Sequence, residues 1–295
     1  MSDCIIIQAH QSHVNSVRFS PDGRFLVSAG MDNALKLWSR GDWELSASVE
    51  AHDKSVNDFA VSPDGATLYT ASTDRTIRSW AFPELTPLRT FKGHKNTIAA
   101  VRLSPDGRLL ATASADGTVR LWDRHTGECA QTLKGHGRSV TSVQFVHGGR
   151  TLATAGLGDN IYLWSVATGE LVGELGGHKA AVTLGGLTPG GEHFITAGYE
   201  GQVKIWNPVT WELESSFEPG ASGLFSLALA PHGRMIAIAS ERNVAIWSLE
   251  LLDVLVELPI KPKGVYGVDF SPDGEFLACA AADKQIRVWT VDAII

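Results

Sequence analysis

The stretch GHKNTIAAVRLSPDGRLLATASADGTVRLWD, residues 93–123, decides the fold because its landmarks recur along the whole chain. It carries a histidine near its start, a Ser-Pro-Asp-Gly turn, an aspartate in a second turn and a tryptophan near its end. Variants of this stretch occur seven times, whereas a catalytic site would need to occur only once. The pattern therefore indicates an internal repeat and not an active site.

Tryptophans mark the period of this repeat. They follow one another at intervals of 42 residues, with a single interval of 41: Trp38, Trp80, Trp122, Trp164, Trp206, Trp247 and Trp289. A histidine lies 28 residues before each of the first five: His10, His52, His94, His136 and His178. Gly220 and Lys261 stand at the two later positions. Because seven periods occupy essentially all of the 295 residues, we expect a single domain over residues 1–295.

Each unit contains four short runs rich in Val, Leu, Ile and Phe, separated by Gly, Pro and Asp. In the first unit the runs are VNSVRFS, FLVSAG, ALKLWS and LSASVE, and no helical period is present. A four-stranded sheet cannot bury both of its faces alone, but a ring of such sheets stacked face to face can, and the ring also removes most exposed edges. The repeat thus predicts an all-β fold, a seven-bladed β-propeller of four-stranded antiparallel blades.

With these residues in view, the chain resembles the WD-repeat family, in which a Gly-His pair leads into strands that end at Trp-Asp. Gly-His is literal at His94, His136 and His178, and Trp-Asp only at Trp122-Asp123. The resemblance covers the full length. It implies that the N-terminal run CIIIQ is an outer strand that closes the ring by joining the three C-terminal strands.

The resemblance also implies that a histidine, a strand Ser or Thr, a turn aspartate and the tryptophan are hydrogen-bonded within a blade. A buried aspartate requires such donors. The matching sets are His10, Ser28, Asp32 and Trp38, then His52, Thr70, Asp74 and Trp80, then His94, Thr112, Asp116 and Trp122. Later units depart from the pattern at Gly158 followed by Asp159, Glu200, Ile238 and Cys279. We therefore expect blades four, six and seven to be tied less tightly.

Composition excludes several classes of function. Three dispersed cysteines fit neither a disulfide framework nor a metal site, and no phosphate-binding loop is present. We expect no cofactor, no bound metal and no catalytic residues. The N-terminus lacks a signal-peptide pattern and no apolar run is long enough to span a membrane, so we expect a cytoplasmic protein that is monomeric on its own. The net charge of −7 argues against a strongly basic nucleic-acid-binding surface.

If the ring performs no chemistry, function lies in side chains that depart from the repeat. The loops around the histidines are net basic, which predicts a basic loop face opposite an acidic back. We expect a non-enzymatic scaffold that binds proteins or peptides with acidic segments there. The candidate partner-binding residues are Met31, Lys95, Arg138, Lys179, Tyr199, Phe225, Arg242, Lys261, Lys263 and Tyr266. A nucleic-acid-binding propeller and an enzyme that uses the central channel remain alternatives.

Two further tryptophans, Trp43 and Trp211, lie outside the period. Both occupy the phase at which other units have Gly127 or Gly169. The shared phase favours packing at the blade edge over a second binding site on the back.

Overall fold

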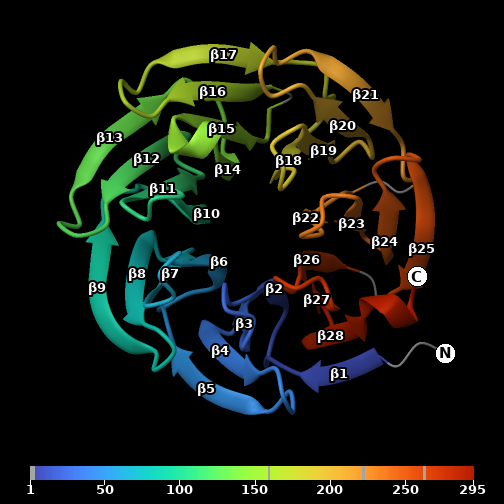
Figure 1. Ribbon diagram of the computed structural model, residues 1–295. Coiled ribbons are helices and arrows are strands. Elements are labelled where there is room, and N and C mark those ends of the chain that lie inside the picture. The colour runs from blue at the N-terminus through green and yellow to red at the C-terminus, as the bar shows by residue number, and fades with distance from the viewer. Residues whose placement is uncertain (1–3, 159, 221–222, 262–263) are drawn as a thin grey trace.

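The computed structural model describes residues 4–158, 160–220, 223–261 and 264–295, and it confirms the predicted propeller. Seven antiparallel sheets of four strands surround a central channel (Figure 1). In six of the seven sheets the chain runs from an inner strand at the channel to an outer strand at the perimeter, and in the seventh the outer strand is β1. The ring is therefore built as a series of radial blades.

The strands are assigned to blades as follows. Blade one comprises β2 (Val14–Phe19), β3 (Phe25–Gly30), β4 (Ala34–Ser39) and β5 (Leu45–Glu50). Blade two comprises β6 (Val56–Val61), β7 (Thr67–Ser72), β8 (Thr76–Ala81) and β9 (Thr86–Lys92). Blade three comprises β10 (Ile98–Leu103), β11 (Leu109–Ser114), β12 (Thr118–Asp123) and β13 (Cys129–Lys134). Blade four comprises β14 (Val140–Val146), β15 (Thr151–Gly156), β16 (Ile161–Ser165) and β17 (Leu171–Leu175).

The second half of the ring repeats this arrangement. Blade five comprises β18 (Val182–Leu187), β19 (Phe194–Gly198), β20 (Val203–Trp206) and β21 (Leu213–Phe217). Blade six comprises β22 (Ser226–Leu229), β23 (Met235–Ala239), β24 (Asn243–Ser248) and β25 (Asp253–Pro259). Blade seven comprises β26 (Val265–Phe270), β27 (Phe276–Ala281), β28 (Gln285–Thr290) and β1 (Cys4–Gln8). Two single-turn 3₁₀ helices, η1 (His147–Gly149) and η2 (Val291–Ala293), complete the described elements.

Both ends of the chain close blade seven. Strand β1 pairs antiparallel with β28, from Cys4 opposite Trp289 to Gln8 opposite Gln285. The predicted role of CIIIQ as the closing outer strand is thereby confirmed. The closure seals an apolar layer against blade one, in which Ile7 and Trp38 are almost fully buried.

The Ser-Pro-Asp-Gly turns that join inner and second strands share one hydrogen-bonding pattern. In the first repeat the Ser20 hydroxyl donates to the Asp22 carboxylate at 2.6 Å and accepts the Phe25 amide at 3.0 Å. Gly23 follows with a φ of 70°, which a side chain would disfavour. Turns beginning at Ser62, Ser104 and Ser271 repeat these bonds.

Within blade three, the four residues implied by the family resemblance lie in one hydrogen-bonded chain. The His94 ring approaches Asp116 at 2.9 Å through Nδ1 and Thr112 at 2.8 Å through Nε2, and the Trp122 indole donates to the Thr112 hydroxyl at 2.9 Å. Burial lowers the pKa of His94, so its ring is neutral. Donors and acceptors then match along the chain: the Trp122 indole donates to the Thr112 hydroxyl, this hydroxyl donates to Nε2 of His94, and Nδ1–H donates to the Asp116 carboxylate.

Blades one and two contain the same hydrogen-bonded chain of four side chains. His10 bonds Asp32 and Ser28, and the Trp38 indole donates to Ser28. Likewise, His52 bonds Asp74 and Thr70, and Trp80 donates to Thr70.

Blade five also forms the chain, with a glutamate in place of the aspartate. The distances are 2.6 Å from His178 to Glu200, 2.8 Å from His178 to Thr196 and 2.9 Å from Trp206 to Thr196. The extra methylene of Glu200 still allows the carboxylate to reach the imidazole. The departure noted in the sequence therefore leaves the connection intact.

The other three blades lack one or more members of the hydrogen-bonded chain. Blade four has Gly158 at the position of the turn acid. There His136 still bonds Thr154 at 2.7 Å, and its ring packs edge-on against Tyr162, with 4.5 Å between the ring centroids. In blade six, where Ile238 replaces the hydroxyl, the buried Trp247 indole N–H has no partner among the described residues. In blade seven Asp283 pairs with Arg287 at 2.5 Å.

Trp43 and Trp211 occupy hairpin turns on the face opposite the histidines. Their φ angles are 60° and 63°, the conformation that Gly127 and Gly169 adopt at the same phase. Trp43 contacts Phe276 of blade seven edge-on, 5.3 Å between centroids, and Trp211 packs against Phe194 and His147. Burial of each indole against a neighbouring aromatic side chain offsets the cost of the left-handed backbone.

Replacing Thr112 with valine should test the hydrogen-bonded chain. The substitution keeps the side-chain shape but leaves the His94 Nε2 and the Trp122 N–H without their shared partner. We expect a loss of about 2 kcal/mol in the free energy of unfolding, measured by urea denaturation. Thr86→Val on the exposed strand β9 is the control and should change stability by less than about 0.5 kcal/mol. Equal effects of the two substitutions would contradict a stabilising role for the chain.

Candidate functional site

Two sets of loops meet on one face of the ring, here called the loop face. One set leads from each outer strand to the next inner strand and carries the histidines. The other set joins the second and third strands and carries the turn acids, as the bonds from His10 to Asp32 and from His178 to Glu200 show. Side chains from both sets therefore surround the same end of the channel.

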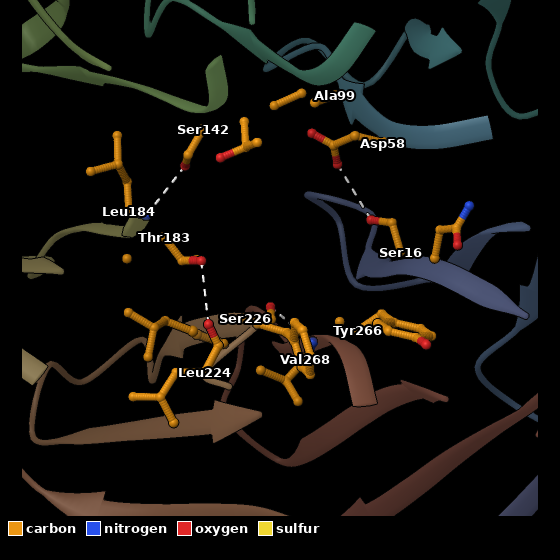
Figure 2. Close-up of a pocket in the computed structure, with 18 of the residues that line it drawn as sticks. Ser16, Asp58, Ala99, Ser142, Thr183, Leu184, Leu224, Ser226, Tyr266 and Val268 are labelled. Carbon is orange, nitrogen blue, oxygen red and sulfur yellow. Dashed lines mark hydrogen bonds between the residues drawn. The ribbon is translucent and has the colours of Figure 1, made fainter. Parts of the chain in front are cut away.

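The channel holds a cavity of about 460 Å³ lined by the inner strands of all seven blades. Figure 2 shows its wall, where several side chains bridge neighbouring blades. The Ser142 hydroxyl accepts the Leu184 amide at 3.2 Å, and the Ser226 hydroxyl accepts the Val268 amide at 3.3 Å. Polar side chains on one inner strand thus bind the backbone of the next.

An arc of aromatic side chains lies at the loop-face end of this cavity. Tyr199, Phe225 and Tyr266 come from blades five, six and seven, and their rings contact one another in sequence at 5.7 and 5.6 Å. The His13 ring of blade one stacks on Tyr266 at 5.9 Å. Tyr199 remains 45% exposed, so the arc is open to a partner. Here the structure brings together three residues that the sequence predicted as a patch.

Two exposed aliphatic side chains extend the arc at its ends. The Met31 amide donates to the His13 carbonyl at 2.9 Å, which places Met31 next to the histidine. Leu157, which also lines the cavity, occupies in blade four the repeat phase that Met31 and Tyr199 occupy in theirs. Both side chains are about half exposed. We call these six residues, Leu157, Tyr199, Phe225, Tyr266, His13 and Met31, the rim arc. Sequence analysis missed Leu157 and His13, although the shared phase was a signal for the former.

The predicted basic residues lie on the loop face without forming one cluster. Lys95, Arg138, Lys179, Arg242 and Lys261 are exposed and are spread over blades three to seven. Lys263 lies outside the described residues. Of this set, Lys179, Arg242 and Lys261 belong to the blades that also provide Tyr199, Phe225 and Tyr266.

The charge of the two faces is more mixed than the histidine loops alone indicate. Asp32, Asp116 and Glu200 lie on the loop face as well, because each bonds a histidine there. On the opposite face, turn aspartates are paired with arginines, as in Arg124 to Asp64 at 2.7 Å. The loop face predicted to be basic therefore carries acidic side chains as well, because the turn acids lie beside the histidine loops.

A charged cluster inside the channel was missed from the sequence. Asp58 on β6 lies between Arg18 on β2, at 2.9 Å, and Arg102 on β10, at 2.5 Å. Its carboxylate also accepts the Val101 amide at 3.0 Å. Burial opposes ionisation, but Arg102 and Arg18 hold the pKa of Asp58 below its usual range. The cluster therefore ties blades one, two and three together at the channel wall.

Asp269 on β26 is the second carboxylate of the channel and has a different environment. It accepts the Phe19 amide at 2.8 Å and so joins blade seven to blade one. Burial raises its pKa to about 6, against the opposing effects of that amide and of Arg18 and Arg102. A sequence signal for Asp58 was present, since the other repeats have uncharged residues at its phase. At the phase of Asp269 two other repeats have arginines, Arg18 and Arg102, so this position is charged in three of the seven repeats.

Neither carboxylate is arranged as a metal ligand or as part of a nucleophilic triad. Among the residues that the structure describes, no group of three or more His, Cys, Asp or Glu side chains could hold a metal ion. The arrangement stabilises contacts between blades and leaves the exposed rim arc as the candidate site.

Asp269→Asn should reveal the cost of ionising this carboxyl. The folded-state pKa of about 6 lies above the unfolded value of about 3.9, so stability falls as pH rises through that interval. Asparagine keeps an acceptor for the Phe19 amide without a charge. At pH 7.5 we expect the variant to be more stable than wild type by about 1–2 kcal/mol, a gain that disappears near pH 4.

Asp58→Asn is the comparison and should lower stability, because it leaves two guanidinium groups without their carboxylate. Both variants would be followed by urea denaturation across pH. A destabilised Asp269→Asn protein at pH 7.5 would show that pairing with Arg18 outweighs the burial of Asp269.

None of the helices in the described ranges is long and apolar enough to cross a membrane. The family model for the WD domain, G-beta repeat, matches residues 2–39, 43–81, 85–123, 127–165, 169–207 and 255–290. Each matched segment runs from an outer strand through three strands of the next blade. The gap in the matches falls on the unit that contains Ile238 and Trp247, whose hydrogen-bonded chain is lost.

Two relatives share a short segment with the chain. Ribosome assembly protein 4 of Saccharomyces cerevisiae is 61% identical over 33 residues, and that of Chaetomium thermophilum is 58% identical over 33 residues. Each match covers 11% of this chain and 6% of the relative. The matched segment is shorter than one 42-residue repeat. Since the family model matches well over half of the chain, the chain belongs to the WD40 repeat family.

Proposed function

We propose that this protein is a non-enzymatic interaction scaffold whose protein or peptide partner binds the loop face at the channel mouth. The observation that carries the proposal is the rim arc: apolar and aromatic side chains from five blades meet around one opening. WD40 propellers are typically interaction scaffolds, which agrees with this reading. The 33-residue similarity to ribosome assembly proteins assigns no role, because it is less than one repeat.

The chemistry of the rim defines the partner. Large, partly desolvated aromatic side chains act as anchors in protein interfaces. Tyr199 and Phe225 present such surfaces beside the cavity, which can receive an apolar side chain of a partner. Lys179 and Lys261 flank the same blades and would attract acidic residues next to that anchor. We therefore propose a partner segment that combines an apolar residue with neighbouring carboxylates.

Selection from a displayed peptide library against the full chain tests this proposal. We expect enrichment of peptides with an apolar residue flanked by Asp or Glu. Tyr199→Ser should weaken their binding at least tenfold in calorimetry or fluorescence anisotropy, since it removes a central anchor. Leu88→Ser, on the outer strand β9 and 58% exposed, is the matched control and should bind as wild type does.

Charge is tested by a second pair of variants. Lys179→Glu should lower affinity and weaken its salt dependence, whereas Arg108→Glu makes the same change in charge on the opposite face and should have no effect. Peptides that bind Tyr199→Ser as well as wild type would contradict the proposed site. Tight binding of RNA or DNA oligomers with steep salt dependence would favour a nucleic-acid-binding propeller instead.

A further inference from the structure

Strand β1 differs from the other outer strands in the described part of the chain because it carries no charge. Its sequence, CIIIQ, contains no Asp, Glu, Lys, Arg, Pro or Gly. Each of the other six has at least one charged residue: Glu50 in β5, Arg89 and Lys92 in β9, Lys134 in β13, Glu174 in β17, Glu214 in β21, and Asp253 and Glu257 in β25. Charges on an edge strand protect it from pairing with another chain. Strand β1 has no such protection.

The backbone of β1 is available for pairing on its outer side. No described strand lies beyond it in its sheet, and it follows the perimeter of the ring (Figure 1). The Ala9 amide donates to the Lys284 carbonyl. Because hydrogen-bonding direction alternates along an antiparallel ladder, the amides and carbonyls of Cys4, Ile6 and Gln8 point away from β28. The free edge therefore presents regularly spaced donors and acceptors.

We propose that β1 is a self-association edge, at which a second copy of this chain pairs antiparallel about a two-fold axis through Ile6. This register places Ile6 opposite its own copy, Ile5 opposite Ile7, and Cys4 opposite Gln8. All these pairs are uncharged, and the aliphatic side chains meet one another. Self-pairing of another outer strand would bring its charged side chains into the contact. Among the described outer strands, β1 is thus the one that can pair with its own copy without bringing charged side chains together, so the partner at this edge is a second copy of β1.

A groove beside β1 supports the same arrangement. It has a volume of about 550 Å³ and is lined by residues 5–8 together with five residues of blade one: Trp38, Asp42, Trp43, Glu44 and Leu45. The acidic side chains Asp42 and Glu44 belong to the turn beside β1 and not to the pairing strand itself. Ile5 and Ile7 pack on this side of the sheet against the same apolar layer. Opposite residues of an antiparallel pair share a face, so Ile7 of the second copy would extend this layer toward Leu45, which is 50% exposed. These aliphatic contacts would bury apolar surface that is exposed to solvent in the monomer.

The consequence is a pair of propellers joined side by side through a continuous sheet of two seventh blades. The rim arc lies on the loop face and not at this perimeter, so each copy keeps its channel mouth free. The expected contact is one strand and a groove, a small interface, which favours reversible association at micromolar concentrations. A dimer presents two rim arcs, so it would bind a bivalent partner more tightly than a monomer does.

Sedimentation velocity of the full chain between 2 and 200 µM tests the proposal. Wild type should shift from monomer toward dimer as concentration rises. Ile6→Lys should weaken the association at least tenfold, because it places two ammonium groups opposite each other at the two-fold axis. Leu88→Lys, at an equally exposed position of the outer strand β9, should associate like wild type.

Further measurements separate the possible failures. Far-ultraviolet circular dichroism and the melting temperature identify an Ile6→Lys protein that has lost blade seven. If the variant has lost blade seven, hydrogen exchange of the wild-type protein is measured instead. The backbone amides of residues 4–8 should then exchange more slowly as the protein concentration rises. A wild-type chain that stays monomeric at 200 µM, or an Ile6→Lys protein that is folded and associates normally, would overturn the proposal. Tyr199→Ser should dimerise as wild type does, so a failure of the rim proposal stays distinguishable.

Discussion

The structure depends on the requirement that the polar groups buried between blades find partners. A blade packs its faces against its neighbours, so any imidazole, indole N–H or carboxylate placed there is removed from water and is costly unless bonded. In blade three the chain from Trp122 through Thr112 and His94 to Asp116 meets this requirement, and it fastens a loop to the second and third strands. Repetition of this unit gives the ring its regularity. The histidines and aspartates therefore serve the fold, although their residue types resemble those of a catalytic triad.

The same requirement explains how the channel wall is built. The inner strand is the edge strand of its sheet at the channel, so its backbone amides on that side need acceptors from side chains. Ser142, Ser226, Asp58 and Asp269 each accept an amide of the next blade. The free energy needed to ionise the buried carboxyl group differs between Asp58 and Asp269. Asp58 has two guanidinium partners, whereas Asp269 has an amide and only more distant arginines, and its pKa is raised to about 6.

Most of the fold could be predicted because its determinants are periodic. The spacing of the tryptophans defined the number of blades, and the runs between turns defined four strands in each. The channel cluster could not be predicted in the same way. Arg18, Asp58 and Arg102 are separated by about 40 residues each and meet only because consecutive inner strands stand side by side. A register shift between Val56 and Asp58, which recurs at the same phase in blades one, three, four and seven, also changes which side chains face the channel. The tryptophan spacing does not reveal this shift, so the side-chain pairs across the channel could not be derived from it.

Two members of the rim arc, Phe225 and Tyr266, come from the blades that lack the histidine, whereas Tyr199 and Met31 come from blades whose hydrogen-bonded chain is intact. In blades one to three the histidine loop is held down by its bond to a turn acid. Blades six and seven have Gly220 and Lys261 at the histidine position, so no imidazole bonds a turn acid there, and in blade seven Arg287 instead bonds both the Lys261 carbonyl and Asp283. Phe225 directly precedes β22 and Tyr266 is the second residue of β26, and their rings contact each other at the channel opening. Between blades six and seven, contact between the rings of Phe225 and Tyr266 thus joins neighbouring loops where the imidazole is missing, and Tyr199 of blade five continues this contact beside an intact hydrogen-bonded chain.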